Sequence, residues 1–268
     1  MPQVHANDID IYYVEVGEGE PLLLIMGITA PGSGWAAHAA SWKAHFRCIM
    51  PDNRGVGFTD KPAGPYSSAQ MADDMAGLLD ELGLRTVPVV GLSMGAAVAQ
   101  QLALRHPEKV HSLVLMCPWA RCDRYTKALL RHMMVLKARL RPEEFMAFMQ
   151  LLIYAKKTWD SDEAYAAMQQ ARDEAAQGPY PQPLHGLEGQ AYACLEHDVL
   201  ASLQHIAVPT LVLGGTEDRF IPSWMSEQVA ERIPGCEIRL YPGTGHAFHF
   251  ERVEEVNEKV LEWLVARA

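Results

Sequence analysis

The sequence lacks most of the features that direct a chain to a membrane, out of the cell or onto nucleic acid. Its first apolar run, Leu22–Met26, is far too short to cross a bilayer, and nothing near Met1 resembles a signal peptide. Basic residues are in the minority, with 23 Lys and Arg against 33 Asp and Glu, and the net charge of −10 repels nucleic acid and anionic lipid. We therefore expect a cytoplasmic protein that has neither nucleic acid nor a membrane as its partner.

Cysteine is scarce as well, and its pattern indicates no disulfide framework. The five cysteines are odd in number, scattered, and not at the spacing of metal ligands. We expect reduced thiols, most of them buried as small apolar side chains. They are Cys48, Cys117, Cys122, Cys194 and Cys236. The sequence predicts no metal site.

What is present is enough apolar material for one good-sized core, since 49% of the 268 residues are hydrophobic. Short, continuously apolar runs closed by Gly or Pro recur in the first half, and such runs are typical of strands buried on both faces of a parallel sheet. These runs are Leu22–Met26, Arg47–Met50, Val87–Val90 and Leu113–Met116. The less regular run Ile9–Tyr13 is expected to form an antiparallel edge strand.

Helical patterns lie between and after these runs. Met71, Met75, Leu78, Leu79 and Leu82 form one apolar stripe at helical spacing. Ser67 or Ser68 can cap the start of this helix, and Gly83 follows its end.

The alternation of strands and helices stops after Pro118 and resumes at the run 210–213. The intervening residues 119–206 contain helical stretches rich in Met and aromatic residues, without a convincing strand. We therefore predict an α/β fold with a mostly parallel, doubly wound sheet. Residues 1–118 and 207–268 would form its core, and residues 119–206 an inserted helical cap.

In a sheet of this kind the functional site lies beyond the carboxyl ends of the strands. There the sequence Gly91-Leu92-Ser93-Met94-Gly95 stands between a strand and a helix of small residues, which is the nucleophile-elbow pattern. The turn is so sharp that side chains two residues on either side of the serine would clash with neighbouring backbone. The pattern predicts that Ser93 is a nucleophile held in a strained backbone conformation.

A serine hydroxyl needs a base, and two further strand ends supply candidates. His246 follows the run 237–241, and Asp218 follows the run 210–213. We predict that His246 is the general base and that Asp218 orients it. Glu217 and Asp123 are alternatives for the acid, and His249 is an alternative base that we expect on the surface.

Acyl transfer also needs donors for the developing oxyanion. The backbone N–H of Met94 comes with the elbow, and the backbone N–H of Ile28, in the loop after Leu22–Met26, is the second candidate. Because all the groups needed belong to the protein, no cofactor is expected.

Taken together, these motifs resemble those of the α/β-hydrolase superfamily over nearly the whole chain. The matching segments are 22–27, 52–57, 91–95, 214–218 and 245–246. Within it the chain is similar to small capped esterases, enol-lactonases and cofactor-free haloperoxidase-like proteins. The resemblance implies that Asp52 and Arg54 form an organising pair near the site. Met26-Gly27 departs from the His-Gly of many relatives, which weakens any transfer of specificity.

The function expected is hydrolysis of a carboxylic ester or lactone of a small to medium, partly apolar molecule. Two alternatives stay open: an amidase, aminopeptidase or carbon–carbon hydrolase with the same triad, and a hydrolase-like receptor with little turnover. An aminopeptidase would need acids in the cap to hold an ammonium group, and five are available: Glu143, Glu144, Asp160, Asp162 and Glu163. Trp119 is a candidate substrate contact. The partner is thus a small-molecule substrate, and the sequence leaves the oligomeric state open.

Overall fold

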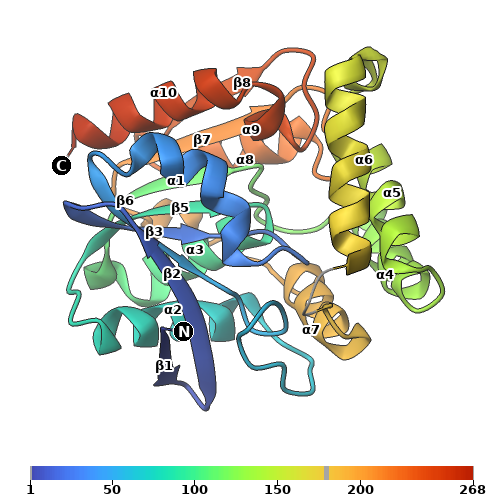
Figure 1. Cartoon of the computed structure of the whole chain (residues 1–268). Helices are drawn as coiled ribbons and strands as arrows, with labels where there is room; N and C mark the ends of the chain where they lie inside the picture. The colour runs from blue at the N-terminus through green and yellow to red at the C-terminus, as the bar shows by residue number, and fades with distance from the viewer. Residues whose placement is uncertain (1, 178–180, 268) are drawn as a thin grey trace.

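The computed structural model describes residues 2–177 and 181–267, apart from the side chains of residues 175 and 176. The described residues form an eight-stranded sheet in the order β1-β2-β4-β3-β5-β6-β7-β8 (Figure 1). β1 and β2 are antiparallel to their neighbours, and the pairs from β4 to β8 are parallel. The strands are β1 Gln3–Ala6, β2 Ile9–Val16, β3 Glu20–Ile25, β4 Phe46–Pro51, β5 Val87–Leu92, β6 Val110–Met116, β7 Thr210–Gly215 and β8 Glu237–Tyr241.

Helices cover both faces of this sheet, as Figure 1 shows. One face packs against α1 Ala36–Trp42, α9 Phe248–Glu251 and α10 Val253–Val265. The other face packs against α2 Ser68–Glu81, α3 Met94–Arg105 and α8 Ser223–Arg232. Short 3-10 helices are Gly32–Trp35, Pro107–Lys109, Lys156–Asp160 and Leu203–His205. The α/β fold with a mostly parallel, doubly wound sheet is therefore confirmed.

The helix predicted from the apolar stripe is α2. Its N-cap is Ser67, whose hydroxyl accepts a hydrogen bond from the backbone N–H of Gln70 (3.0 Å). Gly83 lies just past its end at φ +68°, the left-handed conformation that favours glycine after a helix. Local chemistry thus determined both ends of this helix.

The expectation of an edge strand at Ile9–Tyr13 is half right. This segment is antiparallel, but it lies in β2, which pairs on one side with β4 and on the other with β1. The true edge is β1, formed by Gln3–Ala6. This short strand carries little apolar pattern, and it pairs because the tight turn at Asn7 and Asp8, both at positive φ, folds it back onto β2.

Residues 119–206 lie between β6 and β7 and contribute α4 Arg124–Lys137, α5 Pro142–Ile153, α6 Asp162–Gln177 and α7 Leu184–Leu195. In Figure 1 the helices α4–α6 stand to one side of the sheet layers, while α7 lies beneath them, nearer to the core. We call residues 124–177 the outer cap and residues 181–206 the inner cap. Leu187, Ala191 and Cys194 of the inner cap belong to the same buried apolar cluster as α2 and α3.

Among the described residues, no helix is both long and apolar enough to cross a membrane. The five cysteines are free thiols, and all except Cys236 are buried, as expected from the sequence.

Candidate functional site

Ser93 lies between β5 and α3, at the carboxyl edge of the sheet. Its backbone has φ +55° and ψ −117°, a conformation that costs energy for any residue with a side chain. The flanking glycines permit it, because a Cβ at Gly91 would overlap the carbonyl oxygen of Gly95, and a Cβ at Gly95 would overlap that of Ile25. The expected strained turn is therefore present.

His246 and Asp218 meet at the same edge, from the loops after β8 and β7. His246 Nδ1 lies 2.7 Å from Asp218 Oδ2, and because a carboxylate can only accept, the nitrogen is the donor. The other carboxylate oxygen of Asp218 accepts the backbone N–H groups of Phe220 and Ile221, both at 2.8 Å. The Phe220 ring stands edge-on to the imidazole, with centroids 5.1 Å apart. The acid is therefore held in place, and it leaves Nε2 of His246 as the acceptor.

Cys117 connects Ser93 to this pair. The backbone N–H of Ser93 donates to Met116 O (2.8 Å), and the next residue is Cys117. The Cys117 thiol lies 3.6 Å from the carbonyl oxygen of His246. The sulfur of Cys117, a carboxylate oxygen of Asp218 and a ring nitrogen of His246 all lie within 4.8 Å of one another. Ser93 is 4% exposed and the two residues of the pair are each 7% exposed, so all three are buried at the sheet edge where Cys117 lies.

The same three side chains, Cys117, Asp218 and His246, are of residue types that can bind a metal ion. Burial, followed by the negative charge of Asp218, raises the pKa of the Cys117 thiol well above its usual value, which keeps the sulfur protonated. Nδ1 of His246 is already engaged with Asp218. A protonated thiol and an occupied imidazole nitrogen fit a hydrogen-bonded acid–histidine pair better than a set of metal ligands.

The loop after β3 passes over Ser93. A Cβ at Gly27 would lie 3.4 Å from Ser93 Cβ and 3.9 Å from its Oγ, so Gly27, which precedes Ile28, approaches the hydroxyl closely. Asn53 Nδ2 donates to Met26 O (2.9 Å) and holds the start of this loop. Met94 is the first residue of α3, where backbone N–H groups have no acceptor within the helix. The two N–H groups expected from the sequence thus belong to segments that flank Ser93.

The alternatives for the acid are placed elsewhere. Glu217 is exposed, and Asp123 caps α4 by accepting the backbone N–H of Thr126 (2.7 Å). The expectation that His249 lies on the surface is wrong. Its side chain is 3% exposed, and its Nδ1 lies 3.0 Å from Nε2 of His38, whose Nδ1 donates to Asn257 Oδ1 (2.5 Å). The short helix α9 turns this residue inward, which the spacing from His246 did not reveal.

Asp52 and Arg54 are organising residues, but they do not pair with each other. Asp52 accepts the backbone N–H groups of Gly32 (2.6 Å) and Phe58 (2.8 Å). The Arg54 guanidinium forms two hydrogen bonds with the buried carboxylate of Asp74 on α2, at 2.6 and 2.5 Å. The motif identified Asp52 and Arg54 as organising residues, but it did not show their partners, several of which lie in other segments of the chain.

Trp119 follows β6 and is 1% exposed, edge-on to His197 with ring centroids 5.9 Å apart. Its indole N–H is buried and has no hydrogen-bond partner among the described residues. A buried donor of this kind is rare in a folded protein, and it leaves Trp119 a candidate for contact with a bound molecule.

Sequence reasoning missed residues that brace these loops. Gln190 on α7 accepts the backbone N–H of Thr29 (3.0 Å), next to Ile28. Glu251 accepts the backbone N–H of Gly245 (2.6 Å), next to His246. For Cys117 the sequence predicts only a buried thiol. A buried polar residue on an otherwise apolar helix face is the one signal that could have drawn attention to Gln190.

Comparison with known proteins shows which family the chain resembles. The sequence model described as the alpha/beta hydrolase fold matches residues 20–253. The "Putative carbamate hydrolase RutD" of Azorhizobium caulinodans is 30% identical over 262 residues, covering 97% of both chains. The "Putative non-heme bromoperoxidase BpoC" of Mycobacterium tuberculosis is 32% identical over 272 residues, covering 96% of this chain and 98% of that protein.

Solved structures agree with the sequence relatives. The crystal structure of the Mycobacterium tuberculosis BpoC protein superposes with a TM-score of 0.88 at 30% identity, covering 96% of both chains. A thermophilic esterase from Thermogutta terrifontis superposes with a TM-score of 0.85 at 28% identity, covering 96% of this chain and 94% of the esterase. With the strand order and the strained serine turn already described, this chain is a member of the α/β-hydrolase family.

Proposed function

We propose that the chain is a serine hydrolase that cleaves a carboxylic ester or lactone of a small to medium, partly apolar substrate through an acyl-enzyme on Ser93. The observation that supports this most is the buried hydrogen bond between His246 and Asp218, at 2.7 Å, beside a serine held at φ +55°. Nucleophile, base and orienting acid are the three roles that acyl transfer requires.

In the proposed first step, Ser93 Oγ bonds to the carbonyl carbon of the substrate while His246 Nε2 takes the hydroxyl proton. Asp218 fixes the required tautomer and stabilises the imidazolium that forms. The carbonyl oxygen becomes an oxyanion and accepts the backbone N–H groups of Ile28 and Met94. When the intermediate collapses, the carbon–oxygen bond to the leaving alcohol breaks, and the alkoxide takes the proton from His246.

The second step repeats the chemistry with water. His246 Nε2 takes a proton from a water molecule as its oxygen attacks the acyl carbon, and the proton then goes to Ser93 Oγ as the ester bond to the enzyme breaks. The products are a carboxylic acid and free Ser93. For a lactone, the alcohol and the acid belong to one molecule. The nucleophile of the first step, the base and the oxyanion donors all belong to the protein, so the proposal needs neither metal nor cofactor.

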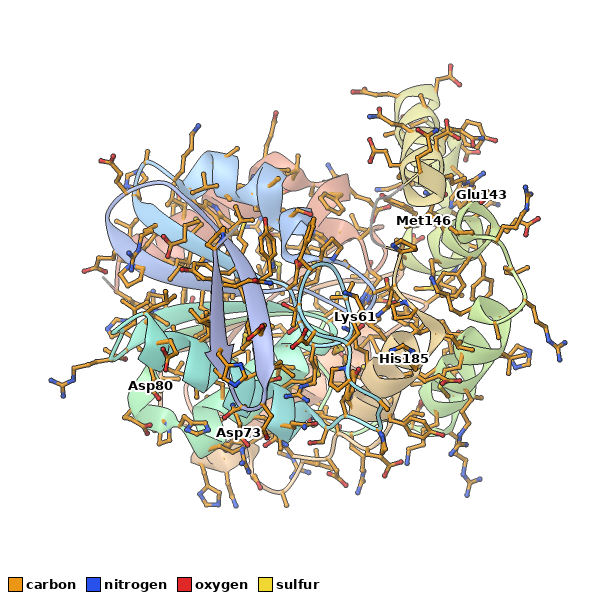
Figure 2. All side chains as sticks on the ribbon, turned by 60° about the horizontal axis from the view of Figure 1, so that its bottom comes forward. Lys61, Asp73, Asp80, Glu143, Met146 and His185 are labelled. Carbon is orange, nitrogen blue, oxygen red and sulfur yellow. The ribbon has the colours of Figure 1, made fainter. Side chains whose placement is uncertain are left out.

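The cap favours an uncharged substrate. Among the described residues of 119–206, no Asp, Glu, Lys or Arg is buried. Of the acids considered for an aminopeptidase, Glu143 and Glu144 form ion pairs with Arg141 at the surface, and the other three are exposed. Figure 2 shows Glu143 on the outer cap, well away from His185 at the start of α7. A buried free ammonium group would therefore lack a counter-charge from these residues.

The type of bond that is cleaved is proposed from the relatives. Similarity to the Thermogutta terrifontis esterase supports an ester as the substrate. The name of the Azorhizobium caulinodans relative describes a carbamate hydrolase. A carbamate carbonyl could be attacked by the same groups, and it is the second candidate. A receptor with little turnover would bind a ligand without completing the second step.

The test is an activity screen across neutral esters, lactones, carbamates and aminoacyl amides, each compared with Ser93→Ala. A fluorophosphonate should label one residue, Ser93, and Ser93→Ala should lower kcat by about a million-fold if the three residues act as a unit. Labelling that persists in Ser93→Ala would refute the assignment. Slow turnover of all substrates by a labelled protein would favour the receptor.

The roles of the acid and the base need their own variants. Asp218→Asn should lower kcat by about four orders of magnitude, as in the serine proteases that provide this figure, because the wrong tautomer is then favoured. His246→Ala should be almost as damaging as Ser93→Ala. Glu217→Gln and Asp123→Asn are the matched controls and should stay near the wild-type rate. A large loss in either control, with a normal rate in Asp218→Asn, would reassign the acid.

A further inference from the structure

Gln190, on the inner-cap helix α7, has an amide whose two ends are both occupied. Its Oε1 accepts the backbone N–H of Thr29 (3.0 Å) and the side-chain amide of Gln182 (2.9 Å). Its Nε2 donates to the carbonyl oxygen of Arg54 (2.9 Å). The residue has no exposed surface. One side chain of the cap therefore joins the loop of Ile28 to the loop of Arg54.

Thr29 needs such a partner. Its backbone has φ +72°, a left-handed conformation that is unfavourable for a β-branched residue. The peptide that carries the Thr29 N–H also carries the Ile28 carbonyl, so a hydrogen bond to this N–H sets the backbone direction on the carboxyl side of Ile28. On the other side, Asn53 holds Met26 O at 2.9 Å. The loop 26–29 is thus fixed at both ends by side chains from outside its own segment.

Docking of α7 onto the core does not itself require Gln190. A Cβ at Gly186 would overlap the Gly55 carbonyl oxygen, and a Cβ at Gly189 would overlap the Tyr66 ring, so the helix backbone already lies directly against the core. At the start of α7, His185 Nε2 lies 3.0 Å from Lys61 O. Figure 2 labels both residues, where the helix meets the core. Gln182 also bridges to Gly55 O (3.1 Å). Gln190 differs from these contacts because it alone among them reaches the loop of Ile28.

We propose that Gln190 is a positioning residue for the oxyanion donor. Its Oε1 holds the peptide after Ile28 so that the Ile28 N–H points at the oxygen of the tetrahedral intermediate. The inference rests on the proposed function, since it concerns the same acyl transfer. It assigns a step of the chemistry to the cap, which otherwise covers the site and contacts the substrate.

The test compares Gln190→Met with Gln182→Met, using an ester that the wild-type protein hydrolyses. Both variants replace a buried amide of the inner cap with an apolar chain of similar length, but only the first removes the acceptor for Thr29 N–H. Gln190→Met should lower kcat by about 10- to 100-fold with KM changed less than about threefold, because a misdirected donor fails in the transition state. Gln182→Met should keep kcat within about threefold.

Gln190→Glu is the rescue variant, since it keeps the acceptor for Thr29 N–H and should keep kcat within about tenfold of wild type and above that of Gln190→Met. If Gln190→Met does not fold, Gln190→Glu carries the test alone. Equal kcat losses in Gln190→Met and Gln182→Met, or a loss greater than about 100-fold in a folded Gln190→Glu, would overturn the proposal. A purely structural role would lower the unfolding midpoint of both Met variants without separating their kcat values.

Fluorophosphonate labelling of the wild-type protein separates the two claims. Absence of labelling at Ser93 would refute the proposed function. Normal labelling of Ser93, together with wild-type kcat in Gln190→Met, would refute the role of Gln190 and leave the proposed function intact.

Discussion

The two long helices at the end of the cap, α6 and α7, follow one another in the chain and differ in almost every contact. Eight of the twelve residues of α7 are buried, and its glycines let the backbone lie directly against the core. In α6, Met168 is the only residue that is buried among the described side chains. The difference teaches that the inserted segment is packed unevenly: α7 lies against the core along most of its length, α4 and α5 each contribute a few buried residues, and α6 is largely exposed.

The outer cap contacts the loop of His246 through a small set of hydrogen bonds. The backbone N–H of Ala247, next to His246, donates to Ile153 O (2.8 Å). Glu251 accepts the N–H of Gly245 (2.6 Å) with one oxygen and the N–H of Ala155 (3.0 Å) with the other, which also accepts the Thr158 hydroxyl. The inner cap is therefore held largely by close backbone packing, whereas the outer cap combines a few buried apolar side chains with polar contacts that converge on Glu251.

The largest effect should come from adding bulk where α7 meets the core. Gly186→Leu forces a side chain into the Gly55 carbonyl and should cost about 3 kcal/mol of unfolding free energy, because backbone cannot move aside cheaply. Ala166→Leu adds the same side chain on the exposed face of α6 and should change stability by less than about 0.5 kcal/mol. Urea unfolding of the two variants measures the contrast. Equal losses would show that the two cap parts are packed alike.

A pH-dependent effect should arise at His197, which follows α7. Burial lowers its pKa from 6.5 to about 4. Between these values the unfolded state binds the proton and the folded state does not, so stability is complete above pH 6.5 and falls as the pH drops toward 4. The loss attributable to this group is at most about 3 kcal/mol.

The measurement is the urea midpoint between pH 7 and pH 4.5. His38 and His249 also have lowered pKa values, mainly because of burial, and add to the same trend in the wild type. His197→Gln should therefore flatten the pH dependence only in part. His132→Gln, at an exposed site on the outer cap, is the control and should leave the curve unchanged. An unaltered curve in His197→Gln would mean that this histidine is not buried as described.

A smaller effect is expected from weakening the contact between the outer cap and the loop of His246. Glu251→Gln replaces one carboxylate oxygen with a donor facing another N–H, which should cost about 1–3 kcal/mol. Amide hydrogen exchange should rise in α5 and α6 and stay unchanged in α7. Glu254→Gln, on the exposed face of α10, is the control. Faster exchange in α7 as well would show that the two parts of the cap open together.

The smallest effect should come from the aromatic side chains on the outside of the cap. Tyr165 is 43% exposed and lies against Trp159, with ring centroids 6.4 Å apart. Tyr165→Ala should cost less than about 1 kcal/mol and leave fluorophosphonate labelling of Ser93 unchanged. A change in preference among acyl chains without a change in labelling would show that the outer cap selects the substrate only. Slower labelling would give it a part in the chemistry.

Much of the fold could be predicted because its causes are local. Short apolar runs closed by Gly or Pro predicted the parallel strands, and Ser67 and Gly83 predicted the ends of α2. The errors occurred where a neighbour decides the outcome. Nothing in the sequence around His249 shows that α9 turns it toward His38, and nothing around Arg54 shows that its partner is Asp74 on α2.

For the candidate site, the sequence by itself determined the strained turn at Ser93 and which residues follow the strand ends, because the glycines around Ser93 are required by the steric crowding of one turn. These residues are the basis of the proposed chemistry. Only the tertiary structure decided what holds those residues in place. Thr29 and Gln190 are 161 residues apart, and Gly215, which packs against the loop of His246, stands far from it in the chain. Contacts at such separations follow no spacing or periodicity, since they exist only after the sheet has brought distant loops to one edge and α7 has packed beside them.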